Sequence, residues 1–309
     1  MRKVLRSAPA EQYVSGSGLL ELGASVLLLS SAWPLTKRAL ALGASPLWFA
    51  EGRAVLSGIV AFAALGLTGR LRLPCRADLA SLFGIGLLQL AGFFLLVHAA
   101  VAWVPAGRTA VLANATTIFV LPLSTFVLGE RVGARRWLGA LVGLAGIATL
   151  MGPWAIDWTD RETLIGHAFL LGAAFSWSLA IIILRRRPPH SSMFAILPWC
   201  FAVASLAMLP LVLIEAPRGG FGPHPEAWAS LAYVGLLAGP VGTWCVMQAT
   251  ASLPVAVSSI GFLATPAAGL MLSNLMLGER LTPDLLIGSA LILGGVGLAA
   301  WPARRGRRA

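Results

Sequence analysis

Residues 79–88 read LASLFGIGLL, and residues 228–237 read WASLAYVGLL. At this offset of 149, residues 79–148 align with residues 228–297 without a gap. LGER at 128–131 then falls on LGER at 277–280. Roughly three in ten aligned positions are identical, against roughly one in ten by chance for so skewed a composition, which indicates an internal duplication.

The duplicated unit extends beyond the gapless part of the alignment. At a slightly smaller offset the preceding helices also match, and Trp33 falls on Trp177. The predicted units are residues 16–152 and 163–302, followed by a basic tail at 303–309. The chain is 58% hydrophobic and 11% charged, whereas a soluble protein carries about a quarter charged residues, so we expect the lipid bilayer to surround it.

Ten stretches are apolar and long enough to span about 30 Å of hydrocarbon. The expected spans are 17–38, 47–67, 79–99, 106–128, 134–152, 164–184, 192–214, 228–249, 256–277 and 284–301. Because each unit holds an odd number of spans, the second unit enters the membrane inverted. The predicted fold is an all-α polytopic membrane protein, with ten transmembrane helices forming two inverted five-helix repeats around a central cavity. In secondary transporters of this design the substrate site lies near the midplane between the halves.

The basic residues predict the orientation. The N-terminus, the even-numbered loops and the tail hold 16 of the 23 Lys and Arg residues, which places both termini in the cytoplasm of an inner-membrane protein. The net charge of +11 therefore orients the chain, and we expect no nucleic-acid partner. Cys75, Cys200 and Cys245 have no paired spacing, so no disulfide framework and no metal site is expected. We expect no cofactor.

The duplicated pattern resembles the EamA-type members of the drug/metabolite transporter superfamily. The resemblance rests on a Trp within the first helix, Arg53 near the start of the second, Pro105–Gly107 at the entry to the fourth, and GER after helices four and nine. It implies transport on this fold and leaves the substrate open among amino acids, metabolites and drugs. The aromatic residues near the midplane look most like YddG-type amino-acid exporters. Thr117 departs from the pattern, since Pro266 occupies the matching place and family members often have Pro in both.

Trp33 and Trp177 are the leading candidates for substrate contact. By the rise of an α-helix they lie about 5–8 Å from the midplane, too deep for an interfacial belt near 15 Å. Core packing is the competing interpretation. Pro34 cannot donate to the Ser30 carbonyl, and this oxygen is freed in one repeat alone because Ser178 replaces the proline in the other. Its partner can be a neighbouring helix, water or a ligand, and we include Ser30 in the predicted substrate site.

Further side chains complete the predicted substrate site: Gln89, Phe93, Asn114, Thr117, Trp244 and Gln248 near the middle of the spans, His98 near the outer end of the third, and Ser259 at the repeat equivalent of Ala110. Gln89 and Phe93 share a face of the third helix, and Asn114 and Thr117 share one of the fourth. Asn and Thr can equally bond across helices. For His98 a structural role with satisfied ring nitrogens is the more common one, with a pH-sensitive gate as the alternative.

The sequence thus predicts an alternating-access exporter of a small-molecule substrate, an apolar or aromatic amino acid. Hydrophobic drugs or other metabolites are the alternative. No Lys or Arg is expected near the membrane centre, which disfavours phosphorylated substrates. The central part of each span also lacks a carboxylate, favouring facilitated export, with proton coupling through Glu21 or Glu51 left open. An enzyme would need clustered titratable groups in the spans, and a scaffold would not need the inverted repeat, so neither is expected.

Overall fold

The computed structural model describes residues 15–130, 133–151, 154, 157–216, 219–253 and 255–300. The basic tail predicted at 303–309 lies outside the described residues. The helices of the first repeat are α1 (Gly16–Ala41), α2 (Pro46–Leu67), η1 (Arg76–Asp78), α3 (Leu79–Phe83), η2 (Gly84–Gly92), α4 (Phe93–Trp103), α5 (Ala106–Ala113), α6 (Thr116–Leu128) and α7 (Ala134–Leu150). Those of the second repeat are α8 (Arg161–Arg186), α9 (Met193–Glu215), α10 (Pro225–Ala232), η3 (Tyr233–Ala238), α11 (Gly239–Ser252), α12 (Val255–Phe262), α13 (Ala264–Leu277) and α14 (Pro283–Ala300).

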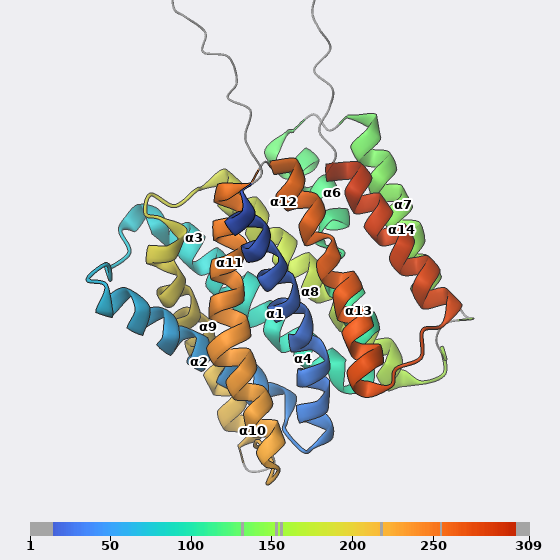
Figure 1. Ribbon diagram of the computed structural model, residues 1–309, viewed down its shortest axis with the longest axis horizontal. Helices are drawn as coiled ribbons and strands as arrows, with labels where there is room; N and C mark the ends of the chain where they lie inside the picture. The colour runs from blue at the N-terminus through green and yellow to red at the C-terminus, as the bar shows by residue number, and fades with distance from the viewer. Residues whose placement is uncertain are drawn as a thin grey trace, which may run out of the picture.

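Within the described part of the chain these helices form ten helical spans. Four of the spans consist of successive segments that follow one path through the bundle, namely η1–α4, α5–α6, α10–α11 and α12–α13 (Figure 1). Seven described helices are long and apolar enough to cross a membrane, and Ala264–Leu277 and Pro283–Ala299 are shorter apolar helices. The predicted all-α membrane fold is confirmed. We call the end of the bundle where residues 16 and 300 lie the terminal end, and the opposite end the far end.

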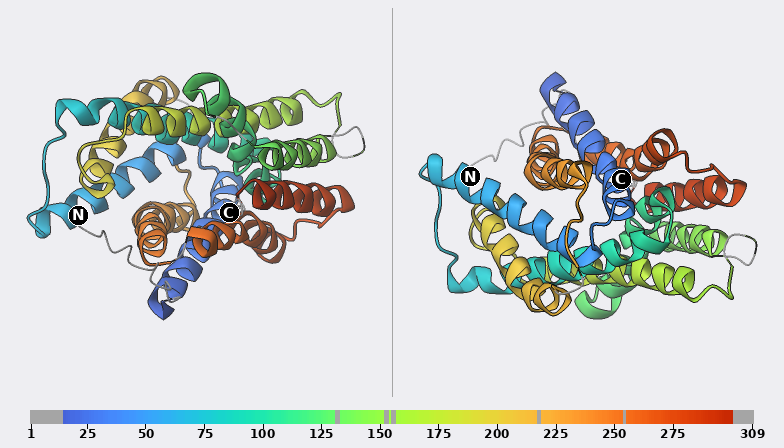
Figure 2. Two further views of the ribbon diagram at one scale, coloured as in Figure 1. Left: turned by 90° about the horizontal axis from the view of Figure 1, so that it is seen from above. Right: turned by 90° about the horizontal axis from the view of Figure 1, so that it is seen from below.

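The first helix of each repeat is embedded in the other repeat. α1 packs against α10, η3, α11 and α13, whereas α8 packs against η2, α4 and α6. α2 and α9 flank this centre on one side, and α7 and α14 pair on the other (Figure 2). The two units therefore share one interior and are held together from within.

The pairing of α7 with α14 shows the inverted relation between the repeats. Gly139 lies against Gly295, and Gly146 lies against the carbonyl of Gly288. These contacts are reciprocal, because Gly139 is the repeat equivalent of Gly288 and Gly146 that of Gly295. Small residues let two membrane helices approach to backbone contact, as the glycine stripes of these helices predict.

Two spans contain π-helical segments that the sequence did not indicate. η2 covers Gly84–Gly92 and η3 covers Tyr233–Ala238, and both begin at equivalent positions of the repeats. A π segment adds a residue to the turn and is frequent at functional sites.

The fourth span of each repeat is interrupted, contrary to the continuous helices predicted at 106–128 and 256–277. The first break lies at Asn114–Ala115 and the second at Leu263, again at equivalent positions. Asn114 and Thr117 therefore lie on separate helices, and the predicted common face for them was wrong. Substrate sites of transporters with inverted repeats lie at such discontinuous helices.

Gly146→Ala tests the α7–α14 contact. A Cβ at Gly146 would lie 2.7 Å from the Gly288 carbonyl oxygen, so the helices must separate, and we expect a loss of about 1–3 kcal/mol of stability. Gly294→Ala is the matched control, because a Cβ there meets nothing within 4 Å and Ala stabilises a helix by about 1 kcal/mol relative to Gly. Thermal unfolding in detergent measures both variants. Equal midpoints for the two would contradict the contact.

Candidate functional site

The centre of the bundle is held together at the two helix breaks. The Ser30 hydroxyl on α1 donates to the carbonyl oxygen of Thr265 at 2.8 Å. The Ser178 hydroxyl on α8 donates to the carbonyl oxygen of Thr116 at 3.0 Å, and also to that of Ala174. Thr116 and Thr265 are repeat equivalents at the start of α6 and α13, so the first helix of each repeat bonds the broken helix of the other.

The two serines reach their equivalent carbonyls from different turns. Ser178 aligns with Pro34, which has no donor to offer, and Ser30 lies one turn earlier on α1. The proline that frees a carbonyl in the first repeat therefore also moves the bonding hydroxyl by one turn. Ser30 and Ser178 are both buried, so both hydroxyls act as structural donors in this conformation.

Trp177 and Phe93 form an aromatic pair across the repeats. Their ring centroids are 4.7 Å apart in a T-shaped arrangement, with Phe93 buried and Trp177 partly exposed. Trp33 is also partly exposed and occupies the space left by Gly269 on α13, where a Cβ would lie 3.1 Å from its Cδ1. Each Trp thus packs on a neighbouring helix while part of its surface stays accessible, and substrate contact by these two residues stays a prediction.

The remaining predicted site residues are spread over a wider region. Gln89 and Gln248 are partly exposed, whereas the Asn114 amide donates to the Ala110 carbonyl of its own helix at 2.7 Å. Trp244 is 45% exposed. The side chains of Thr117 and Ser259 lie outside the described residues.

Trp244 lines a cavity of about 200 Å³ between α2, α9 and the η3–α11 span. Its walls are almost entirely apolar, with Val60 and Ala64 on α2, Phe194 on α9 and Pro240 on α11.

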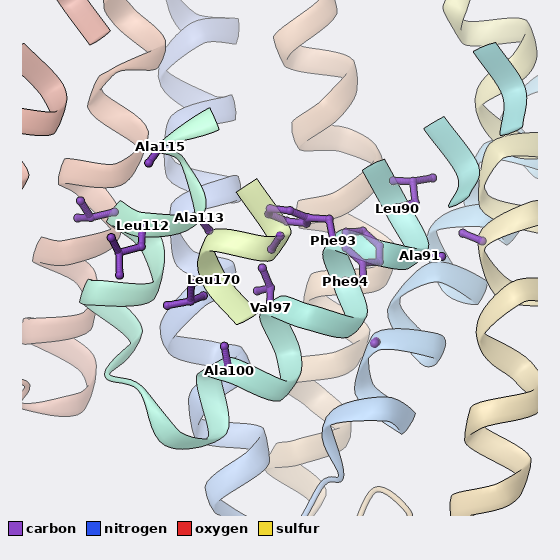
Figure 3. Packing of buried hydrophobic residues seen from close by; sticks show 14 of the residues in the cluster. Leu90, Ala91, Phe93, Phe94, Val97, Ala100, Leu112, Ala113, Ala115 and Leu170 are labelled. Atoms are coloured by element: carbon purple, nitrogen blue, oxygen red, sulfur yellow. The ribbon is translucent and has the colours of Figure 1, made fainter. Parts of the chain in front are cut away.

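His98 belongs to an aromatic cluster that was not predicted from the sequence. Its ring is buried beside Phe49 and Phe94, at centroid distances of 5.6 and 5.8 Å. The guanidinium of Arg53 lies over the Phe94 ring, with its Cζ 4.3 Å from the ring centroid. Figure 3 shows Phe93 and Phe94 side by side on α4, near Leu112, Ala113 and Ala115 at the first helix break.

Arg53 corrects the prediction that no Lys or Arg lies near the membrane centre. α2 covers Pro46–Leu67, so Arg53 is about 5 Å along the helix from its middle. The sequence held the signal, since the depth argument applied to Trp33 and Trp177 applies equally to this residue. Its position in a family motif near the start of the second helix led us to treat it as a residue of the helix end.

The far end of the bundle is closed by three polar contacts. Both Glu279 carboxylate oxygens accept from backbone amides at the start of α5, Ala106 at 2.6 Å and Gly107 at 2.8 Å. Beside them Arg108 and Asp284 form an ion pair at 2.7 Å that is about nine-tenths buried. Lys37 on α1 donates to the carbonyls of residues 101, 102 and 104 at the end of α4. A carboxylate on unpaired amides at a helix N-terminus is a favourable, charge-assisted contact.

The terminal end carries the equivalent acid in another arrangement. Glu130, the repeat counterpart of Glu279, lies 3.4 Å from Arg185, and both side chains are 41–49% exposed. Exposed pairs of this kind contribute little to stability. The pair borders a cavity of about 260 Å³ that reaches along α6 to Thr116 at the helix break. The two ends are therefore closed to different degrees, although the sequences of their loops are repeated.

The described residues include no group of three or more His, Cys, Asp and Glu side chains that could hold a metal ion. Cys75, Cys200 and Cys245 are all free thiols.

Comparison with known proteins identifies two copies of one domain. The model of the EamA-like transporter family matches residues 16–152 and 164–301. The aromatic amino acid exporter YddG of Ancylobacter novellus is 30% identical over 231 residues, covering 72% of this chain and 76% of that protein. A probable amino-acid metabolite efflux pump of Escherichia coli is 26% identical over 290 residues, covering 89% and 93%.

Two further comparisons agree on the class and the fold. The transporter YdfC of Bacillus subtilis is 27% identical over 248 residues, covering 78% of each protein. A solved crystal structure superposes with a TM-score of 0.60 at 23% identity, covering 94% of this chain and 99% of the other.

Ser30→Ala tests the bond across the repeats at the second helix break. Removing a buried hydroxyl that donates to a carbonyl of another helix is expected to lower stability by about 1–2 kcal/mol. Ser25→Ala is the control, because Ser25 is equally buried on α1 but bonds the Leu22 carbonyl of its own helix. Thermal unfolding in detergent should give a lower midpoint for Ser30→Ala than for Ser25→Ala. Identical midpoints would remove the energetic role of this contact.

Proposed function

The chain belongs to the EamA-like transporter family, whose members are transporters rather than enzymes, and from this premise we propose that it exports apolar or aromatic amino acids. We place it in the inner membrane with both termini in the cytoplasm, as its basic residues predict. The observation that carries the substrate assignment is the Phe93–Trp177 pair, which joins the two repeats beside a helix break. Aromatic rings offer an apolar side chain edge and face contacts of about 0.5–1.5 kcal/mol each.

Alternating access is the proposed mechanism, supported by the unequal closure of the two ends. Glu279, Arg108 and Lys37 close the far end, which faces outward in this orientation. Glu130 at the cytoplasmic end pairs with Arg185 in an exposed position. Because the repeats are inverted copies, exchanging their conformations would transfer the carboxylate cap from α5 to α12. The helix breaks allow the halves to move while the Ser30 and Ser178 bonds keep the centre aligned.

Hydrophobic drugs are the second candidate, favoured by the apolar walls of the cavity beside Trp244. A drug without charged groups needs apolar area and few polar contacts, whereas an amino acid needs partners for both of its charged ends. The same assay separates the two candidates.

Transport by the purified protein in liposomes tests the assignment. We expect counterflow of phenylalanine, tryptophan or leucine, and Trp177→Ala should reduce it at least tenfold by removing the ring that pairs with Phe93. Trp33→Ala should act similarly, and Trp154→Ala, 71% exposed beyond α7, is the control with unchanged transport. Movement of hydrophobic drugs without any amino acid would contradict the proposed substrate.

Glu279→Gln tests the outer closure. The amide keeps one acceptor but loses the charge, so the far end should open more often. A cysteine placed at Thr109, buried one turn inside α5, reports opening through its labelling by a membrane-impermeant thiol reagent added outside, with the three native cysteines replaced by serine. We expect labelling to accelerate several-fold.

Glu226→Gln provides the control for this measurement, because Glu226 lies at the same end but pairs with Arg38 in an exposed position. Its labelling rate should equal that of the parent. Equal rates for Glu279→Gln and the parent would show that the carboxylate does not hold the outer side closed.

A further inference from the structure

Arg53 is a cation near the middle of a membrane span without a compensating acid. Among the described residues no carboxylate lies within 4.0 Å of its guanidinium, and Nε is buried without a hydrogen-bond partner. Glu51 is two residues earlier and therefore points to another side of α2. Arg53 as a whole is half-buried, so its guanidinium is within reach of a bound solute. A charge that loses part of its hydration without gaining a counter-charge carries a desolvation penalty. The contact with Phe94 offsets a small part of that penalty, since a cation–π contact contributes about 0.5–2 kcal/mol.

His98 presents a second unsatisfied group against the same Phe94 ring. Nδ1 lies 2.6 Å from the carbonyl oxygen of Phe94, so it carries the proton and donates. In the neutral ring Nε2 is then an acceptor, and it is buried without a partner. The side chain is 1% exposed and packed between Phe49 and Phe94, which fixes the direction in which Nε2 points.

The two groups are complementary to a zwitterion. A guanidinium offers a planar set of donors that matches a carboxylate, and an imidazole acceptor matches an ammonium. A carboxylate alone would leave Nε2 without a donor, and an amine alone would leave the guanidinium without an anion. An α-amino acid carries both charges on one carbon and satisfies both groups together.

Apolar and aromatic residues next to Arg53 and His98 offer contacts to the side chain of such an amino acid. The Phe93 ring lies 6.3 Å from that of Phe94 and 4.7 Å from that of Trp177, so the aromatic pair continues directly from the polar groups. On α2, Val60 and Ala64 of the apolar cavity are seven and eleven residues after Arg53 and share its helix face. Apolar surface is therefore available on both sides of the charged position.

We propose that Arg53 and His98 form the binding site for the charged headgroup of the substrate, Arg53 holding the α-carboxylate and His98 Nε2 accepting from the α-ammonium. This inference rests on the proposed function and narrows it to free α-amino acids. It excludes their amides and esters, simple carboxylates, and uncharged drugs as preferred substrates.

Matched solutes test the two halves of the site in liposomes. Phenylalaninamide lacks the carboxylate, and 3-phenylpropionate lacks the ammonium, while both keep the aromatic ring. The wild-type protein should carry phenylalanine at least tenfold better than either. Arg53→Met should lower phenylalanine transport at least tenfold and leave phenylalaninamide unchanged, because only the former uses the guanidinium. His98→Phe, which keeps the ring stacking, should remove the preference for phenylalanine over 3-phenylpropionate.

Controls separate recognition from folding. Arg53→Lys keeps the charge and should restore part of the preference over phenylalaninamide. Arg38→Gln removes an exposed cation from the last turn of α1, away from the proposed site, and should leave the transport of all three solutes unchanged. The shift in the thermal unfolding midpoint on adding each solute in detergent provides a binding readout for any variant that reconstitutes poorly, and it should follow the same order.

The outcomes distinguish this site from the proposed function. Transport of phenylalanine without preference over its amide, or an equal loss of all solutes in Arg53→Met, would overturn the headgroup site and leave amino-acid export standing. Transport of drugs with no amino acid carried by the wild-type protein would overturn both.

Discussion

A backbone amide or carbonyl that is exposed inside a membrane must find a partner within the protein, because the hydrocarbon supplies none. The interruptions at Asn114–Ala115 and Leu263 create such groups in the middle of two spans. Hydroxyls from the first helix of the opposite repeat donate to carbonyls beside both breaks. These bonds connect α1 and α8 to the broken helices of the other half, so the interior belongs to both repeats at once.

The same requirement applies at the ends of the broken helices, and there the two repeats differ. The amides at the start of α5 receive both oxygens of Glu279, whereas the equivalent acid, Glu130, lies beside Arg185. Sequence differences reinforce the contrast, since Arg108 and Asp284 form a buried pair at the far end while Val257 and Arg135 occupy the equivalent positions. Nearly identical GER segments thus take part in two kinds of contact, as expected of inverted copies in one asymmetric conformation.

The centre contains polar side chains that have hydrogen-bond partners and others with atoms that lack them. Ser30, Ser178 and Asn114 have partners in the protein and serve its architecture. Arg53 and His98 share the Phe94 ring and keep unsatisfied atoms in a buried place. Unsatisfied polar groups are costly, so their presence next to an aromatic pair points to a molecule that binds there.

The sequence by itself determined the all-α membrane class, the duplication and, from the odd number of spans, the inversion, because apolar length and repetition are written directly in the chain. It also located Trp33, Trp177 and Phe93 by depth. It did not determine the helix breaks or the π segments, because neither Asn114 nor Leu263 is a glycine or a proline, the residues that most strongly disfavour a helix. The partners of Ser30 and Glu279, and the lack of partners at Arg53 Nε and His98 Nε2, were decided by the tertiary structure alone, because whether a polar group is satisfied depends on which neighbours the packing of the two repeats brings to it.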